Sequence, residues 1–336
     1  MSYRHVHIGD CQQLQLHIYV VGYQPMGESI LVVLWDDEAK DTLKTILIDC
    51  FELAGKNELE NVFKQYNIDK KKFNVIVWTH PDLDHSVGFS RIVDNYTCAD
   101  TLFLLPEGFS PFYKSFLHKS MIKSWLAVAK NRWLKRKLNV ERVNASNLRE
   151  FPMSYQPTYY EDGLGDGIKF SIEMLTPFAG QVFKYLDHNS THKGNHISIS
   201  LLVRLGEISF YFGGDTENEA INMVDINKLQ NVVFVKIPHH GSPSSLSLPV
   251  TLEKLKEQNL IPEITSVSSG YHRKNEDYPD DDVLTQYKDI SSNVLLTERG
   301  NTIDKYGIVY CPFNINPYIV KPYALSGAAM KWYGKL

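Results

Sequence analysis

Four side chains that can bind metals lie within six residues of the sequence. His80, Asp82, Asp84 and His85 form an H-x-D-x-D-H pattern directly after the apolar run at residues 73–78. Imidazole nitrogens and carboxylate oxygens coordinate divalent cations, and side chains on a turn between a strand and a helix can converge on one point. From composition, this pattern is expected by chance on the order of 10⁻³ times in a chain of this length. The segment is therefore interpreted as a metal site.

Two later segments place further candidate ligands after apolar runs. Asp215 follows residues 208–212 and two glycines. His239 and His240 follow residues 232–237. Ligands of α/β sheets gather where strands end and loops begin, and glycine lets the backbone approach them closely. The pattern predicts one site assembled from several strand ends.

The elements that position these side chains are predicted from hydrophobic patterning. Short β-rich runs fill the first part of the chain, and helical and strand patterns alternate after residue 58. The predicted strands cover residues 14–21, 29–35, 45–50, 73–79, 101–105, 199–205, 208–212, 232–237 and 264–267, and the predicted helices cover residues 58–66, 87–95, 216–224 and 248–258. This alternation is typical of an α/β layer structure.

Composition places the chain among ordinary globular proteins. It has 336 residues, of which 43% are hydrophobic and 22% charged, with a formal net charge of −4. These values exclude disorder and low complexity for the chain as a whole, and we expect a single domain over residues 1–336. The N-terminus lacks the apolar core of a signal peptide, and no apolar run reaches membrane-spanning length. The expectation is a cytoplasmic protein without membrane association.

One segment differs from the rest in charge. Residues 114–142 contain nine Lys or Arg residues and one acidic residue, in a chain that is acidic overall. Apolar residues recur there at helical spacing, which predicts a basic helical insertion at residues 106–156 with one or two amphipathic helices. Its basic face is either a solvated surface or a phosphate-binding cap over the active site, in which Lys135, Arg136 and Lys137 bind substrate.

The motifs resemble, in order and spacing, those of the metallo-β-lactamase fold, and within it the hydrolase domain of ComEC-type competence proteins. Over residues 14–309 the matching segments are G-E-S-I at 27–30, L-I-D at 47–49, H-P-D-L-D-H at 80–85, N-H-I-S-I-S-L-L at 195–202, G-D at 214–215 and H-H-G-S at 239–242. The resemblance implies an αββα four-layer sandwich with hydrolase activity. Residues 278–279 are Tyr-Pro where the family often has His-Pro, and nothing resembles the family's multispan channel region.

The resemblance also implies roles for individual side chains. It assigns His80 and Asp82 to one divalent cation and Asp84 and His85 to a second. Asp215 bridges the two cations. Asp84 and Asp215 therefore serve both as ligands and as catalytic residues.

Further roles in the site follow from the resemblance and from side-chain chemistry. His196 could complete the first cation site or be a core histidine of an apolar strand. The side chains of adjacent residues diverge, so only one of His239 and His240 is expected to coordinate the second cation, while the other contacts substrate or donates a proton. The sequence leaves the choice open; we assign the ligand role to His239 and the catalytic role to His240. Asp49 is expected to orient a ligand from behind, and Ser242 to bind a phosphate oxygen or to cap a turn.

Two divalent cations that activate a water molecule predict hydrolysis. The cations are expected to be Mn²⁺ or Zn²⁺. Asp82 replaces the family's usual second histidine, which makes the site richer in oxygen and favours Mn²⁺ and phosphodiester substrates. We expect a nuclease acting on DNA or RNA. The alternatives are a hydrolase of small phosphodiesters or other esters, and a partner-binding scaffold on a degenerate hydrolase fold. Similar proteins act in bacterial antiviral systems with an activating partner, so a protein activator is a second expected partner besides nucleic acid.

Overall fold

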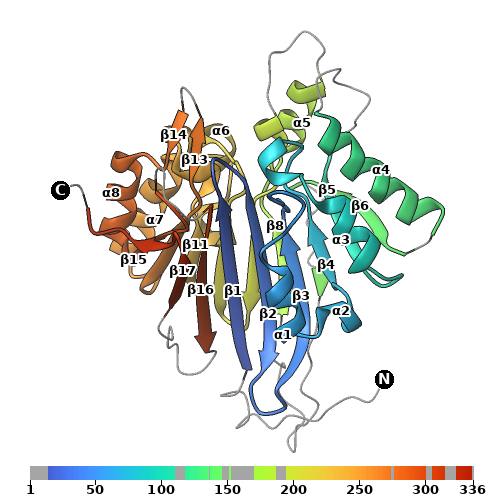
Figure 1. Cartoon of the computed structure of the whole chain (residues 1–336). Coiled ribbons are helices and arrows are strands. Elements are labelled where there is room, and N and C mark those ends of the chain that lie inside the picture. Colours follow the sequence, from blue (N-terminus) through green and yellow to red (C-terminus); the bar gives the residue numbers. More distant parts are fainter. Residues whose placement is uncertain are drawn as a thin grey trace, which may run out of the picture.

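Two eight-stranded mixed sheets stack face to face and carry helices on their outer surfaces (Figure 1). The computed structural model describes residues 14–109, 118–135, 137–145, 151–152, 170–186, 194–273, 276–299, 305–314 and 323–334. Among these residues, none of the helices combines the length and apolar character needed to cross a membrane.

The first sheet has the strand order β17-β16-β1-β2-β3-β4-β5-β6. Its strands are β1 (Leu14–Tyr23), β2 (Glu28–Asp36), β3 (Asp41–Ile48), β4 (Val75–Val77), β5 (Leu102–Pro106), β6 (Asn139–Val143), β16 (Tyr306–Asn314) and β17 (Ala324–Gly327). Strands β17 to β3 pair antiparallel, whereas β3, β4, β5 and β6 are parallel. Because parallel strands end at the same edge, the segments after β3 and β4 leave the sheet side by side.

The second sheet has the strand order β18-β15-β12-β11-β10-β9-β8-β7. Its strands are β7 (Phe151–Pro152), β8 (Phe170–Met174), β9 (Leu201–Leu205), β10 (Ile208–Phe212), β11 (Val232–Lys236), β12 (Ile264–Ser268), β15 (Ser291–Leu296) and β18 (Met330–Lys331). Strands β10, β11, β12 and β15 are parallel, so their ends also share an edge. A separate hairpin of β13 (Tyr271–Arg273) and β14 (Glu276–Tyr278) follows β12.

The helices divide between the two outer faces (Figure 1). Those packed with the first sheet are α1 (Glu60–Gln65), α2 (Ile68–Lys71), α3 (Phe89–Asn95), α4 (Lys119–Trp133) and α5 (Ala179–Leu186). Those packed with the second sheet are α6 (Asn218–Ile221), α7 (Ser247–Glu257) and α8 (Asp281–Ile290). The predicted α/β class is therefore confirmed.

Side-chain alternation along the strands explains why the sheets are covered on both sides. In β1, Leu16, Ile18 and Val20 lie in a core shared by the two sheets, whereas Tyr19 and Val21 lie in the cluster that contacts the helices. Alternate residues of a strand point to opposite faces, so this strand is buried on both. The central core joins apolar side chains of both sheets, which fixes how the sheets stack.

The basic segment is only partly helical, which corrects the prediction of a helical insertion. Its helix is α4, and residues 139–143 form β6, which pairs parallel with β5. A helix between two parallel neighbours is the usual crossover connection, so α4 and β6 belong to the layered architecture. Residues 110–117, 136, 146–150 and 153–156 of the predicted insertion lie outside the described residues.

Candidate metal centre

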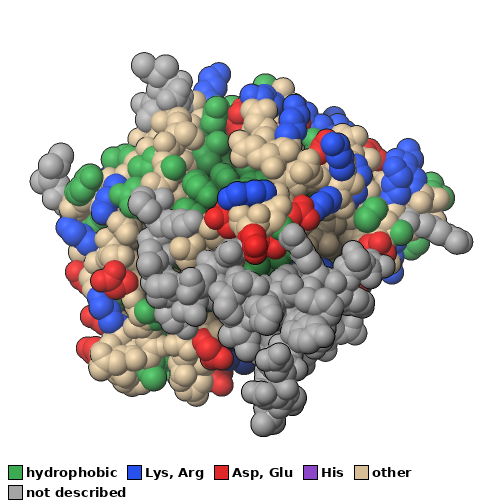
Figure 2. All heavy atoms as spheres, turned by 90° about the horizontal axis from the view of Figure 1, so that it is seen from below, with side chains coloured by type: hydrophobic (Ala, Val, Ile, Leu, Met, Phe, Trp, Pro, Cys, Tyr) green, Lys and Arg blue, Asp and Glu red, His purple; other side chains and the backbone are tan. Residues whose placement is uncertain are grey.

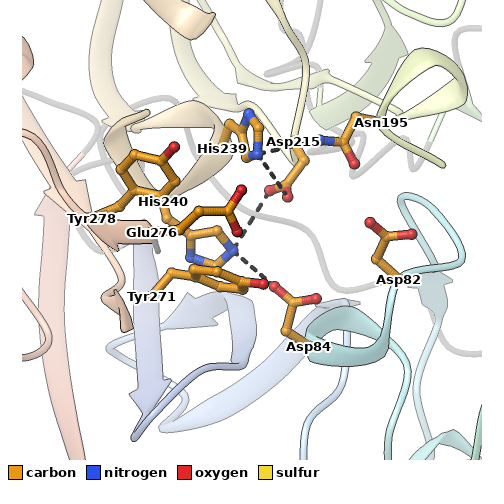
Figure 3. A pocket seen from close by; sticks show the side chains of 9 residues that line it. All are labelled: Asp82, Asp84, Asn195, Asp215, His239, His240, Tyr271, Glu276 and Tyr278. Carbon is orange, nitrogen blue, oxygen red and sulfur yellow. Dashed lines mark hydrogen bonds and ion pairs between the residues drawn. The ribbon is translucent and has the colours of Figure 1, made fainter. Parts of the chain in front are cut away.

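The candidate ligands meet at the edge where the parallel strands of both sheets end. Nine residues from several segments line one pocket there, and Figure 3 shows their side chains. They are Asp82, Asp84, Asn195, Asp215, His239, His240, Tyr271, Glu276 and Tyr278. The segment after β4 supplies the aspartates of the H-x-D-x-D-H pattern, and the segments after β10 and β11 supply Asp215 and the two histidines. The prediction of a site built from strand ends is confirmed for these residues.

Four of the side chains form a tight buried cluster. Asp84, His85, Asp215 and His240 each offer one ligand atom, and these atoms lie within 4.8 Å of one another. His85 Nε2 lies 3.3 Å from Asp215 Oδ1 and 3.5 Å from Asp84 Oδ2. His240 Nε2 lies 3.1 Å from Asp84 Oδ2 and 3.3 Å from His85 Nε2. Two ring nitrogens and two carboxylates thus face one point, which is the donor set of a divalent cation site.

The other oxygen of Asp215 faces a second set of side chains. Asp215 Oδ2 lies 3.6 Å from His80 Nε2 and 3.9 Å from His239 Nε2. His80 Nε2 also lies 3.7 Å from Asp82 Oδ2. The two oxygens of one carboxylate therefore point to two groups of ligands. The second group is more open, because 40% of the Asp82 side chain is exposed and Figure 3 shows it set apart across the pocket.

Two buried polar atoms in the centre lack a hydrogen-bond partner in the part of the chain that the structure describes, as expected if they coordinate a cation. Among the described residues, His80 Nε2 and Asp215 Oδ1 have no hydrogen-bond partner although both atoms are buried. An unpaired buried polar atom costs about 1–3 kcal/mol, and most such atoms in proteins have a partner. A cation coordinated by these atoms would remove that cost. The residues present therefore fit a divalent cation, and the geometry leaves the number and identity of the ions open.

Asp49 orients two of the histidines from behind the cluster. Its Oδ2 lies 2.7 Å from His85 Nδ1 and accepts a 2.7 Å hydrogen bond from Thr79 Oγ1. Thr79 Oγ1 in turn lies 3.0 Å from His80 Nδ1. Because the threonine proton points to Asp49, the threonine oxygen accepts from the Nδ1–H group of His80. Both rings then present Nε2 to the pocket, as metal-binding histidines do when a carboxylate holds the other nitrogen.

Glu28, Asp49 and His85 form a second buried group that could hold a cation. His85 Nδ1 lies 3.7 Å from Glu28 Oε1 and already forms the shorter contact with Asp49. Glu28 is in turn 2.8 Å from the buried ammonium group of Lys236. Because His85 contacts Asp49 and Glu28 contacts Lys236, these residues hold the side chains of the first cluster in position from behind.

The backbone around His239 and His240 corrects a prediction about their side chains. Both residues and the following Gly241 have positive φ angles of 47°, 53° and 80°. Three successive residues in this conformation turn both imidazoles toward Asp215, where one faces each oxygen. Only one of the two, His240, lies in the tight cluster with Asp84 and His85, while His239 faces the other oxygen of Asp215. The tight cluster contains His240, which had been given the catalytic role, rather than His239, which had been named the ligand.

Charges in the pocket shift the pKa values of its groups in opposite directions. Burial lowers the pKa of His80 to about 4, helped by the charge of nearby His85. Burial acts the same way on His85, but the carboxylates of Asp215 and Asp84 outweigh it and raise its pKa well above the usual value. Partial burial and the charges of Asp84 and Asp215 raise the pKa of Asp82 to about 7. Without a cation, the carboxylates thus hold a proton on His85 that a cation would displace.

Two predicted site residues, His196 and Ser242, do not line the pocket. His196, on the turn Gly194–Ile197, does not line the pocket, and its neighbour Asn195 does. Asn195 Nδ2 lies 3.2 Å from His239 Nε2. Ser242 is buried, and its hydroxyl accepts from the backbone N–H of Ser244 at the start of the turn Pro243–Ser245. Of its two predicted roles, the structure shows the turn cap.

The lysines predicted to cap the active site lie at the other edge of the sheet. Lys135 forms a 2.7 Å ion pair with Asp94 at the end of α3, and Lys137 follows shortly before β6. Strands β4, β5 and β6 are parallel, so the start of β6 is opposite the edge where β4 delivers His80. Neither lysine lines the pocket, which corrects their assignment as a cap. Arg136 lies outside the described residues.

Sequence reasoning gave no role in the site to seven polar residues that support or line it from distant segments, although several of them lie in the matching motifs. These are Glu28, Lys236, Ser269, Asn195, Tyr271, Glu276 and Tyr278. A signal was available for Lys236, because a lysine that ends an otherwise apolar strand is expected to be buried with a partner. Tyr271 packs on His240 with ring centroids 5.3 Å apart, and nothing in its local sequence indicates that contact.

No family model matches the chain, and no curated protein matches it. Functional conclusions therefore rest on the geometry and chemistry of the site.

Proposed function

We propose that this protein is a hydrolase of the metallo-β-lactamase fold that uses two divalent cations to cleave phosphodiester bonds, with DNA or RNA as substrate. The observation that carries the proposal is the position of Asp215. One of its oxygens faces His85 and His240, and the other faces His80 and His239. A carboxylate between two sets of ligands is what a two-metal hydrolytic site requires.

The arrangement of the layers supports the fold named in this proposal. Two mixed sheets share a central apolar core, helices cover their outer faces, and the ligands gather at the edge of both sheets. The motifs lie along the chain in the order that the resemblance implies.

When bound, a pair of divalent cations lowers the pKa of a water molecule and neutralises charge that develops on phosphate oxygens. The side chains of the protein contribute by positioning the ligand atoms. Asp49 directs His80 and His85 into the pocket, and Asp215 sets the spacing of the two ligand groups. Asn195 and Tyr271 line the same pocket, where an amide N–H and a phenol O–H can donate hydrogen bonds to substrate oxygens.

The charges of the pocket favour a hard cation and make the binding of a phosphodiester depend on it. Its lining includes the carboxylates of Asp82, Asp84, Asp215 and Glu276, and among the described residues no Lys or Arg lines it. An anionic phosphate would be repelled by this lining without cations, so substrate binding is expected to require them. Oxygen-rich donor sets favour Mn²⁺ and similar hard ions over Zn²⁺.

The surface of α4 supports a polynucleotide rather than a small substrate. Lys119, Lys123 and Lys130 are exposed on one side of the helix, and Trp133 is 62% exposed beside the Arg132 guanidinium. In Figure 2, which views the molecule from below, Lys and Arg side chains gather on the right, the side on which α2, α3 and α4 lie in Figure 1. Only an extended substrate could contact both this surface and the pocket, through backbone charges and base stacking. A protein activator that docks on the same surface is a second proposed partner.

A small phosphodiester or another ester is the second candidate function. The pocket suits it, because among the described residues no Lys or Arg that could hold the backbone of a long polynucleotide lines it. Drift to a scaffold without activity is disfavoured, since the ligand atoms of Asp84, His85, Asp215 and His240 still converge.

The proposal is tested by metal analysis followed by hydrolysis assays. Purified protein is expected to contain or take up Mn²⁺ or Zn²⁺, and to cleave labelled DNA or RNA with Mn²⁺. Asp84→Ala should lose at least 100-fold in rate, while the matched variant of exposed Asp100, Asp100→Ala, keeps the wild-type rate. Cleavage of bis(p-nitrophenyl) phosphate without cleavage of any polynucleotide would favour the small-substrate function. An Asp84→Ala rate equal to wild type would contradict both.

A further inference from the structure

A buried ion pair behind His240 joins the two sheets. Lys236 Nζ, at the end of β11, lies 2.8 Å from Glu28 Oε2, at the start of β2. About 1% of each side chain is exposed. Buried ion pairs are seldom better for stability than apolar residues of similar volume, because both charges lose their hydration. The pair therefore calls for a role beyond packing.

Ser269 links this pair to His240. Its hydroxyl donates a hydrogen bond to Glu28 Oε2, and its oxygen lies 3.0 Å from His240 Nδ1. Lys236 offers only donors and an ionised Glu28 only acceptors, so the single proton of Ser269 points to Glu28. The serine oxygen can then only accept from His240, which requires a proton on Nδ1.

We propose that Lys236 and Glu28 act through Ser269 as positioning residues that keep the Nδ1 proton of His240 in place and aim its Nε2 at the cation site. Nε2 lies 3.1 Å from Asp84 Oδ2 and 3.7 Å from Asp215 Oδ1. The inference rests on the proposed function, because it gives His240 the role of a ligand. It adds that His240, on the second sheet, is oriented by a carboxylate of the first sheet, as Asp49 orients His85.

The charge balance of the pair allows a sharp test. Glu28 and Lys236 carry opposite charges, so replacing both with apolar residues leaves the net charge near the site unchanged. The double variant Glu28→Leu with Lys236→Met removes the pair, and Ser269→Ala removes the link. Because Ser269→Ala changes no charge, a change in its cation affinity reports the orientation of the His240 ring rather than the electric field of the site.

The first measurement is Zn²⁺ affinity by calorimetry of the full-length protein. Loss of a group that orients a metal-binding histidine typically weakens affinity 10- to 100-fold, and we expect this for both variants. Combining them should weaken binding no further, because all three residues form one chain of contacts. The matched control is Ser266→Ala, which removes a buried hydroxyl on β12, three residues before Ser269, that forms a hydrogen bond with Ser291. It should bind Zn²⁺ like wild type.

The second measurement is the Nδ1–H resonance of His240 in ¹⁵N-histidine-labelled protein. It should be protected from exchange in wild type and in Ser266→Ala, and be lost in Ser269→Ala and in the double variant. Wild-type affinity together with an unchanged resonance in Ser269→Ala would overturn the inference. If wild type takes up no cation, the proposed function fails, and the resonance alone decides the inference: its absence from wild type overturns it.

Discussion

His85 Nδ1 lies 2.7 Å from Asp49 Oδ2, and both side chains are fully buried. Since Nδ1 donates its proton to this carboxylate, Nε2 of the same ring is the nitrogen that faces Asp215 and that would give up its proton to bind a cation. Thr79 extends the influence of Asp49 to His80. One carboxylate thus sets the orientation of a ligand in each of the two groups around Asp215.

The substitution Asp49→Asn should therefore weaken cation binding without removing a ligand. An amide can present its NH₂ group to His85, which would move the ring proton to Nε2. We expect Mn²⁺ or Zn²⁺ affinity to fall roughly 10- to 100-fold by calorimetry. The control is Asp36→Asn, which alters a buried aspartate that accepts from the backbone of a turn after β2. Equal affinity in wild type and Asp49→Asn would exclude this role.

Glu298, a buried carboxyl that is not among the candidate ligands, predicts a dependence of stability on pH. Burial raises its pKa to about 7, against opposing effects of Gln24 and His240. A carboxyl whose folded pKa is raised favours the folded state most at low pH, and this contribution falls as pH rises from about 4.5 to about 7. Glu298→Gln removes the cost of ionisation. The variant should gain roughly 3 kcal/mol in free energy of unfolding at pH 8, and nearly nothing at pH 4.

This prediction is checked by urea denaturation in the presence of a chelator, at both pH values. Glu263→Gln, a change at an exposed position, is the control and should behave like wild type. A gain at pH 4 equal to that at pH 8 would show that ionisation of Glu298 is not the cause.

The exposed lysines of α4 should govern binding of polynucleotides and leave small substrates unaffected. The triple change of Lys119, Lys123 and Lys130 to Gln removes three cations from one side of the helix. Binding of labelled single-stranded DNA, measured by anisotropy in a chelator, should weaken, and the slope of log affinity against log salt should become less negative by roughly 0.7 for each lost phosphate contact.

The same variant should hydrolyse bis(p-nitrophenyl) phosphate at the wild-type rate, because these lysines do not line the pocket. Changing Lys64, Lys70 and Lys254 to Gln, which are exposed elsewhere, provides a control of equal charge. If both triple variants lose the same affinity, net charge rather than the surface of α4 explains binding.

Gly214 should be intolerant of a side chain. Its φ angle is +50°, and an added Cβ would lie 2.6 Å from Ser198 Oγ and 2.7 Å from the carbonyl oxygen of Ile199. Ser198 accepts the backbone N–H of Asp215, so the clash would also displace that carboxylate. Gly214→Ala should lower the free energy of unfolding by about 1–3 kcal/mol and weaken cation binding. In Gly180→Ala, on α5, the new Cβ meets nothing within 4 Å, and stability should rise by roughly 0.5–1 kcal/mol.

Sequence reasoning placed correctly those residues that directly follow a recognisable apolar strand. His80 to His85 and Asp215 follow strands whose apolar runs are plain, so their convergence at strand ends could be predicted. The orientation of His239 and His240 could not, because it depends on three successive positive φ angles. The partnership of Glu28 with Lys236 also escaped, since 207 residues separate them and only the stacking of the sheets brings them together.

In the basic segment, the spacing of charged and apolar residues predicted helices where the structure has a helix and a strand. Its lysines and apolar residues favoured helices throughout, but residues 139–143 pair with β5 in parallel register. Pairing with a neighbouring strand outweighs local helical preference, and no pattern within five residues reveals the partner. The same error placed Lys135 and Lys137 over the active site, because their distance from His80 depends on the direction of β6.

The ligands come from both halves of the sandwich: His80, Asp84 and His85 follow β4 of the first sheet, and Asp215 and His240 follow β10 and β11 of the second. A cation bound by all of them would link the two sheets. Cation binding and unfolding would then be coupled equilibria. The free energy of unfolding would rise by about 2.7 kcal/mol when the free cation concentration is one hundred times its dissociation constant. Cellular supply of the metal would thus set how long the folded chain survives, even when no substrate is present.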